Sequence, residues 1–203
     1  FGFLTRLNMV DFFDPEKLEA LKSRIKKFEY GTILIYGYGA ALVEPDPDIL
    51  VYADMARWEI QKRMRRNEVS NLGVENREEA FELQYKRGFF LDWRVCDRLK
   101  KQLMGSWDYV LDTNIAGKPN MATGRAVNSA IEHAYTRPFS LVPYFDPGPW
   151  GGQWMKKVLG LEKESHNLAW CFNCVPEENS LYLGFEEVVF EIPSINLVFR
   201  DPV

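Results

Sequence analysis

Apolar positions in the first part of the chain switch between helical spacing and short continuous runs. Asp14 followed by Pro15 is typical of a helix start, and apolar residues then recur at intervals that keep them on one helical face. We therefore expect a helix over residues 15–28, ended by Gly31. The next run, residues 32–36, is short, β-branched and apolar, which predicts a strand buried on both faces of a sheet.

The same alternation continues as far as residue 135. Further apolar runs predict strands at residues 49–53 and 107–111, and periodic stretches predict helices at residues 54–64, 93–100 and 123–135. Asp54 stands directly before its helix and is expected to cap it. Strands that alternate with helices indicate βαβ units with right-handed crossovers. We therefore expect residues 1–140 to form an α/β domain, with a mostly parallel sheet and flanking helices.

From residue 139 onward, short alternating runs follow one another without a long amphipathic helix. They predict antiparallel strands at residues 139–145, 168–174, 181–185, 188–192 and 195–199. Strands spaced this closely normally close into a sandwich or a barrel. We therefore expect residues 141–203 to form a β region, whose last strands leave an open edge.

Composition narrows the class of protein. The 203 residues are 46% hydrophobic and 14% aromatic, which is enough for a packed core. The net charge of -4 comes from interspersed charges without a basic block, so nucleic-acid binding is not expected. No apolar run approaches the ~20 residues that span a bilayer, and the first residues lack the pattern of a signal peptide. Because three cysteines are too few for a disulfide framework, we expect a cytoplasmic protein without membrane association.

A rim of glycines and carboxylates is one candidate binding site. Gly37 and Gly39 follow an expected strand, where turn amides can approach a phosphate. Asp54 and Asp112 come at the C-terminal ends of expected strands, the edge where open α/β sheets bind ligands, and Arg57 can add a phosphate donor. The glycines lack the third member of a dinucleotide fingerprint. A structural turn, and a helix cap with its solvated neighbour, remain the alternatives.

The chain offers weak signals for metal or nucleophilic chemistry. Cys171 and Cys174 have the Cys-x-x-Cys spacing of zinc and dithiol sites, but residues three apart on a strand point to opposite faces. We interpret both as buried apolar residues. Neither His133 nor His166 has a partner histidine at metal spacing. We therefore expect no catalytic residue and no metal ligand in this chain.

Several segments resemble a known enzyme family. Trp150-Gly151-Gly152, and Trp170 in a later segment of similar spacing, are similar to the opening of the cupin barrel in class I mannose-6-phosphate isomerases. Upstream, residues 51–61 and 85–90 look like the long bacterial version, which carries an α/β region before its cupin. At residues 168 and 173 this chain has leucine and asparagine where the family has glutamate and serine, so the roles of those side chains do not carry over.

The resemblance implies both a fold and an activity. It implies that residues 141–203 are the first strands of a cupin, in which Trp150, Gly151, Gly152 and Trp170 are structural. For a complete protein it implies zinc-dependent interconversion of mannose 6-phosphate and fructose 6-phosphate by proton transfer, with metal ligands that would all follow Val203. Two other classes stay open: a non-catalytic nucleotide- or phosphate-binding module, and a structural or oligomerising domain without a ligand.

Overall fold

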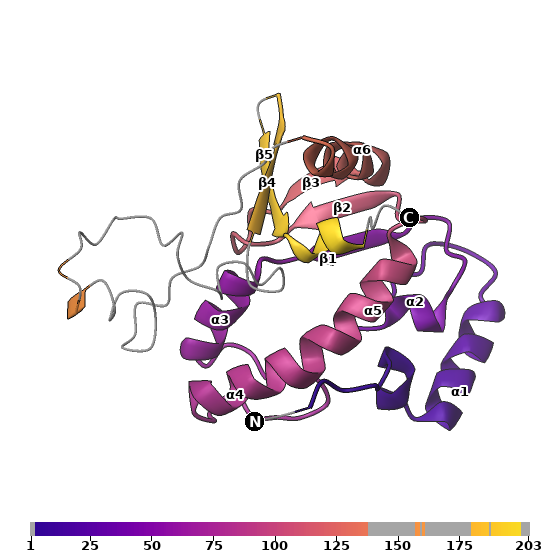
Figure 1. Cartoon of the computed structure of the whole chain (residues 1–203). Coiled ribbons are helices and arrows are strands. Elements are labelled where there is room, and N and C mark those ends of the chain that lie inside the picture. Colours follow the sequence, from indigo (N-terminus) through magenta and orange to yellow (C-terminus); the bar gives the residue numbers. More distant parts are fainter. Residues whose placement is uncertain (1–2, 138–156, 159, 161–179, 187, 200–203) are drawn as a thin grey trace. The chain divides into compact units, whose positions relative to one another are not determined.

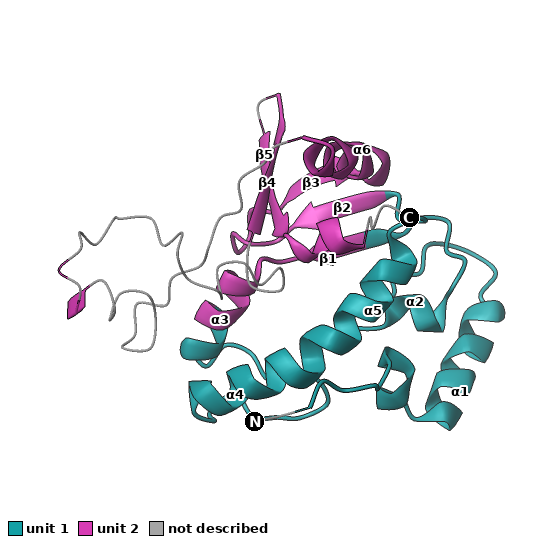
Figure 2. Cartoon of the chain, in the orientation of Figure 1, with its two compact units in different colours: residues 1–51, 63–108 teal, residues 52–62, 109–203 magenta. Residues whose placement is uncertain are grey.

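The computed structural model of the chain describes residues 3–137, 157, 158, 160, 180–186 and 188–199. Helices and two small sheets make up this part of the protein (Figure 1). The chain divides into two compact units (Figure 2). Unit 1 comprises residues 1–51 and 63–108, and unit 2 comprises residues 52–62 and 109–203.

Unit 1 is built from helices. Its elements are a 3-10 helix η1 (Met9–Phe12), α1 (Pro15–Lys26), α2 (Ala40–Val43), α4 (Phe81–Arg87), a π-helical turn η2 (Gly88–Asp92) and α5 (Trp93–Leu103). Helical backbone continues from α4 through η2 into α5, so the wide turn is enclosed in one long helical run. Tyr85 and Phe89 pack against Trp93, with ring centroids 5.7 and 6.1 Å away, and Trp93 is buried.

Two helices expected in unit 1 are confirmed. The helix expected over residues 15–28 is α1, and Asp14 caps it by accepting hydrogen bonds from Glu16 N (3.0 Å) and Lys17 N (3.1 Å). The helix expected around residues 93–100 is α5, although helical backbone begins earlier, with α4. Both helices have strong local signals, a cap in one case and a wide amphipathic face in the other.

The strand expected at residues 32–36 is wrong. This segment has no regular secondary structure, and the side chain of Leu34 is 82% exposed. Gly31 and Gly37 bound it, at φ 99° and 119°, which is backbone that other residues rarely adopt. An apolar run becomes a strand only where another strand pairs with it, and none does so in the part of the chain that the structure describes.

Unit 2 contains both sheets. Its elements are β1 (Val51–Asp54, from Tyr52 onward), the first turns of α3 (Arg57–Arg65), β2 (Tyr109–Asp112), β3 (Asn120–Thr123), α6 (Gly124–Tyr135), β4 (Ser180–Phe185), β5 (Val188–Pro193) and α8 (Ile195–Val198). The first sheet has the order β1-β2-β3, and the second is the hairpin of β4 and β5. The fully buried apolar residues of this unit include Ala56, Val110, Val127, Ile131, Phe190 and Ile192.

The first sheet is mixed, whereas a mostly parallel sheet was expected. β1 and β2 run parallel, because Asp108 N donates to Leu50 O (2.9 Å) at their start and Thr113 N donates to Asp54 O (3.0 Å) at their end. β3, which the sequence did not predict, pairs antiparallel with β2. The α/β class is therefore correct, and the parallel alignment holds for β1 and β2.

Most other elements expected in unit 2 are confirmed. The expected strands at residues 49–53 and 107–111 are β1 and β2, and the expected helix at residues 123–135 is α6, capped by Thr123 Oγ1, which accepts from Ala126 N (3.2 Å). The expected helix at residues 54–64 is α3, but Asp54 ends β1 and does not cap the helix, which begins at Arg57.

The hairpin and the end of the chain give a mixed result. The strands expected at residues 181–185 and 188–192 are β4 and β5, which pair antiparallel. The strand expected at residues 195–199 is wrong, since these residues form the short helix α8. The strands expected at 139–145 and 168–174, and the domain boundary near residue 140, lie outside the described residues. The described strands form no closed barrel.

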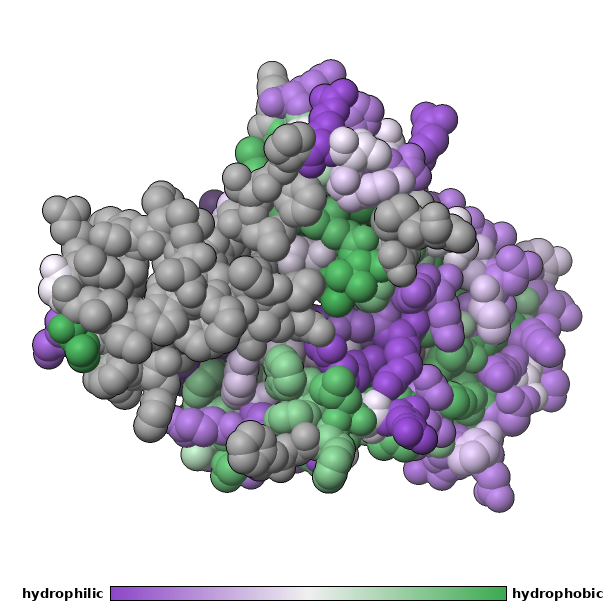
Figure 3. Space-filling model, in the orientation of Figure 1, coloured by the Kyte–Doolittle hydropathy of each residue, from purple (hydrophilic) through white to green (hydrophobic). Residues whose placement is uncertain are grey.

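The hydropathy of the helices and of the surface can be compared with the sequence-based expectations. Among the described helices, none is both long enough and apolar enough to cross a membrane. On the face that Figure 3 draws, apolar side chains form separate groups between polar ones.

Candidate functional site

Two residues of the expected rim lie at one edge of the first sheet in unit 2. Asp54 is the last residue of β1 and Asp112 is the last residue of β2, and each side chain is buried. Because β1 and β2 are parallel neighbours, their carboxyl ends meet at this edge. The structure therefore brings these two carboxylates to the same end of the sheet.

Asp112 links the first sheet to the hairpin. Its Oδ1 accepts a hydrogen bond from Asn114 N (3.0 Å), and its Oδ2 accepts one from Glu191 N (2.8 Å) on β5. A buried carboxylate is costly unless N–H groups satisfy its oxygens, and here both oxygens are satisfied. Both oxygens of the Asp112 side chain thus have a structural role, because each accepts a hydrogen bond from the main chain.

Asn114 makes a second link from the same loop. Its Oδ1 accepts from Ala56 N (2.7 Å), directly before α3, and its Nδ2 donates to Glu191 O (3.0 Å). Thr113 Oγ1 also donates to Asp54 O (2.7 Å). The loop after β2 therefore holds the end of β1, the start of α3 and the middle of β5 together.

Glu191 brings its own carboxylate into this arrangement. The side chain is buried, and its Oε1 accepts a hydrogen bond from Trp58 Nε1 on α3. Tyr182 lies opposite Glu191 in the hairpin, and its hydroxyl is hydrogen-bonded to the Glu191 carboxylate. Partial burial raises the pKa of Tyr182, whose side chain is 49% exposed, and the negative charge of Glu191 raises it further. We call Asp112, Asn114, Glu191, Trp58 and Tyr182 the polar junction.

The rest of the expected rim is placed differently. Arg57, the first residue of α3, belongs to unit 2 with the two aspartates and is buried. Gly37 and Gly39 belong to unit 1. Gly39 has φ 79°, and a Cβ there would lie 2.7 Å from the ring of Phe13, so close packing requires glycine. It precedes only the four-residue helix α2, which favours a structural turn over a phosphate site.

The polar junction is better suited to holding elements together than to chemistry. Both oxygens of Asp112 and Oε1 of Glu191 already accept hydrogen bonds from protein N–H groups, which leaves them poorly placed to act as bases. Within the described ranges, no group of three or more His, Cys, Asp or Glu residues could hold a metal ion. Glu191 and Asn114 did not stand out in the sequence, because their partners are far away along the chain.

A second buried polar cluster, in unit 1, was also missed. Asp92 Oδ2 accepts from Asn71 Nδ2 (2.6 Å) and from Leu72 N (3.2 Å). Gln84 is fully buried and donates to Val69 O (3.1 Å) and Asn76 O (2.8 Å). Burial raises the pKa of Asp92 and outweighs the opposing hydrogen bond from Asn71. The sequence signal for this cluster was Asp92 itself, a charged residue directly after the apolar run Phe89-Phe90-Leu91.

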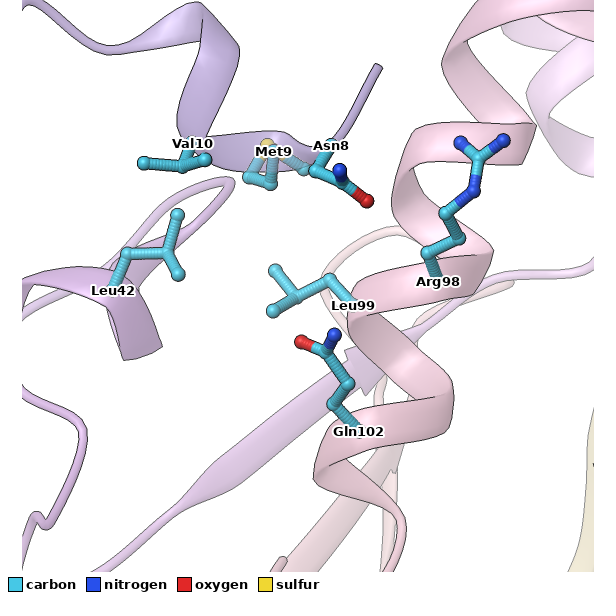
Figure 4. A pocket seen from close by; sticks show the side chains of 7 residues that line it. All are labelled: Asn8, Met9, Val10, Leu42, Arg98, Leu99 and Gln102. Carbon is cyan, nitrogen blue, oxygen red and sulfur yellow. The ribbon is translucent and has the colours of Figure 1, made fainter. Parts of the chain in front are cut away.

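Unit 1 also has a hollow of about 250 Å³ (Figure 4). Its lining consists of Asn8, Met9, Val10, Leu42, Arg98, Leu99 and Gln102. The side chain of Leu99 points toward Leu42, whereas the guanidinium of Arg98 turns away. That guanidinium donates to Leu7 O (2.6 Å) and to Thr5 O, so it holds the start of the chain against α5. We therefore interpret the hollow as a gap in the packing, because its one cationic group, the Arg98 guanidinium, already donates hydrogen bonds to backbone carbonyls.

Comparison with known proteins assigns the chain to a family. Residues 1–136 match the family described as a domain of unknown function, DUF8485. The chain belongs to this family. The DUF8485 region includes all of unit 1 and, in unit 2, the elements from β1 to α6, while the hairpin of β4 and β5 follows it. No curated protein and no solved structure matches the chain. Trp150, Gly151, Gly152 and Trp170 lie outside the described residues.

Proposed function

We propose that this chain is part of a cytoplasmic sugar-phosphate isomerase resembling mannose-6-phosphate isomerase, and that its DUF8485 region supports the following β part without performing chemistry. In this proposal the hairpin of β4 and β5 belongs to the opening of a cupin. Zinc and its ligands come from segments after Val203, and the substrate is a hexose phosphate.

The observation that carries the supporting role is the link between Asp112 and Glu191. The N–H of Glu191 in the middle of β5 donates to a buried carboxylate at the end of β2 (2.8 Å), and Asn114 Nδ2 donates to the carbonyl of the same residue (3.0 Å). Hydrogen bonds to both main-chain groups of one residue fix its position along the sheet edge. A strand held in this way suits a scaffold that positions the first strands of a barrel.

The two segments that resemble the long isomerases, residues 51–61 and 85–90, lie largely in regular secondary structure. Residues 51–61 build β1 and the first turns of α3, where Trp58 donates to Glu191. Residues 85–90 lie in the helical run around the buried Trp93. A resemblance concentrated in packed elements supports a shared fold for this region, and the activity stays with the complete protein.

Activity of the protein encoded by the complete gene tests the proposal. We expect conversion of mannose 6-phosphate to fructose 6-phosphate, lost on treatment with a chelator and restored by zinc. Trp58→Phe in that protein should lower the melting temperature and leave kcat/KM unchanged, because Trp58 serves the scaffold. An inactive zinc-loaded protein would contradict the isomerase, and a fall in kcat/KM at unchanged melting temperature would contradict the supporting role.

The phosphate-binding alternative makes a different prediction for this chain alone. A ligand that binds the folded state raises the melting temperature by mass action. We expect mannose 6-phosphate, inorganic phosphate and nucleoside triphosphates each to leave the melting temperature of this chain unchanged. A rise with a nucleotide, abolished by Arg57→Gln, would favour the binding module.

A further inference from the structure

Unit 1 has an uncharged stretch whose first part is exposed. No charged residue occurs between Glu29 and Glu44, and residues 30–38 of this stretch are exposed apart from the half-buried Ile35. Within the stretch the exposed fractions are 86% for Tyr30, 82% for Leu34 and 88% for Tyr36. Soluble proteins rarely leave a continuous apolar stretch of this kind in water, and tyrosine is enriched at protein interfaces. The stretch therefore has the composition of a binding surface.

The backbone of residues 32–36 has no strand partner among the described residues. None of the backbone hydrogen bonds found in the described part of the chain involves these residues. Their sequence, Thr-Ile-Leu-Ile-Tyr, has high strand propensity. Lysine, proline and inward-pointing charges usually protect exposed strand edges, and this segment has none of them. Free backbone groups beside apolar side chains are the surface to which another strand can be added.

The side chains of this segment are complementary to themselves. If two copies run antiparallel about Leu34, then Leu34 faces Leu34, Ile33 faces Ile35 and Thr32 faces Tyr36. Each of these is a favourable cross-strand pair, and no like charges meet. A two-fold axis through Leu34 makes the contact identical for both copies, as in most homodimers.

The flanking charges favour the antiparallel direction. Before the segment, Arg24, Lys26 and Lys27 outnumber the single acidic residue Glu29, and after it the charged residues Glu44, Asp46 and Asp48 are all acidic. Antiparallel pairing brings the basic flank of one copy toward the acidic flank of the other, whereas parallel pairing would bring like charges together. The charges thus select a second copy of this chain, in one orientation, as the occupant.

We propose that residues 32–36 pair with the same residues of a second copy of the chain, antiparallel and centred on Leu34. This pairing buries the uncharged stretch and gives its backbone hydrogen-bonding partners. The strand that the sequence favours at this position then forms between two copies. The proposal is independent of the isomerase assignment.

Disulfide trapping tests the register. In the proposed pair the two Leu34 Cα atoms lie about 5 Å apart, within reach of a disulfide, whereas the two Thr32 Cα atoms lie about 14 Å apart. Under mild oxidation Leu34→Cys should therefore give a covalent dimer in high yield. Thr32→Cys should stay at the level of the parent chain, which contains its own cysteines. Equal trapping of both variants, or of neither, would overturn the proposal.

Mass measurement in solution tests the pairing itself. The chain should sediment with twice the mass of one copy, and Leu34→Lys, which places a charge opposite itself, should shift it to one copy. Leu83→Lys is the matched control, because Leu83 is also exposed (53%) but lies on α4. A parent chain that stays single at high concentration, or a Leu34→Lys variant that stays double, would refute the pairing.

Discussion

The carboxyl group of Asp92 is buried without full compensation. Its Oδ2 accepts two hydrogen bonds, but its Oδ1 is buried and accepts none from the residues that the structure describes. Burial therefore raises the pKa of Asp92 above its usual 3.8. Because the pKa is higher in the folded chain than in the unfolded chain, protonation favours folding. This contribution is fully present below the unfolded pKa and is lost as the pH rises through the folded pKa.

Asp92→Asn should remove this dependence on pH. The amide keeps an oxygen that can accept from Asn71 and Leu72 and carries no charge to bury. We expect a free energy of unfolding at neutral pH that equals or exceeds that of the parent chain, and a flatter profile above the unfolded pKa of 3.8. Urea unfolding across that range measures it, with the exposed Glu75→Gln as control. An unchanged profile would show that Asp92 is not the titrating group.

Tyr182 offers a second titration, to which its neighbour Glu191 contributes more than the other nearby carboxylate, Asp112. Its pKa is raised first by burial and then by the charge of Glu191. Glu191→Gln should lower the pKa of Tyr182 but leave it above the ordinary value, since burial remains. The absorbance of phenolate measures this titration. Subtracting the titration curve of the Tyr182→Phe variant from that of the parent chain leaves the signal of Tyr182 alone. Glu186→Gln in the same hairpin should leave the titration unchanged, and an equal shift in both variants would argue against the direct contact.

Gly39 and Gly37 distinguish backbone strain from steric conflict. Both have positive φ, but a Cβ at Gly39 would lie 2.7 Å from the Phe13 ring, whereas a Cβ at Gly37 would meet nothing within 4 Å. Alanine costs backbone strain at either position, and at Gly39 overpacking adds roughly 1–3 kcal/mol. Chemical denaturation should therefore give a lower free energy of unfolding for Gly39→Ala than for Gly37→Ala. Equal losses would mean that Phe13 moves aside freely.

At the scale of elements, the sequence predicted what local chemistry determines. α1 and α6 each begin at a side-chain cap, Asp14 or Thr123, which lies within three residues of the N–H groups it accepts from. β1 and β2 are apolar runs next to helices and were also predicted. In these cases every signal lies inside the element or directly beside it.

Elements that depend on distant partners were predicted poorly. Residues 32–36 have the composition of a strand but no described partner, and residues 195–199 have a similar composition yet form helix α8. Short apolar runs are compatible with either structure, so their surroundings decide. β3 has a weak pattern and exists because β2 pairs with it.

The candidate site follows the same rule. Asp54 and Asp112 could be placed at one sheet edge because strand ends are visible in the sequence. Glu191 could not be joined to them, because Asp112 is 79 residues away along the chain. The use of these carboxylates as hydrogen-bond acceptors for the hairpin is a property of the tertiary structure.

At the scale of the whole molecule, the family boundary divides the polar junction. The DUF8485 match ends at residue 136, so a fragment of residues 1–136 keeps Asp112, Asn114 and Trp58 but lacks Glu191. It also lacks the apolar face of the hairpin that packs against β2 and α6. Each lost hydrogen bond costs about 1 kcal/mol net. We expect the fragment to unfold at lower urea concentration than the full chain.

Trp58→Phe separates loss of the junction from loss of chain length. Phenylalanine keeps an aromatic ring beneath Lys62, whose Nζ lies 4.2 Å from the ring centroid, but it cannot donate to Glu191. In the full chain the substitution should cost about 2 kcal/mol, because it removes the N–H donor of a buried carboxylate and leaves only the Tyr182 hydroxyl bonded to it. In the fragment of residues 1–136 the donor has already lost its acceptor, so the cost should be less than about 0.5 kcal/mol. Urea unfolding of the four proteins gives the coupling energy. If Trp58→Phe costs the same in both backgrounds, Trp58 stabilises the DUF8485 region itself, and the link to the hairpin contributes nothing to its stability.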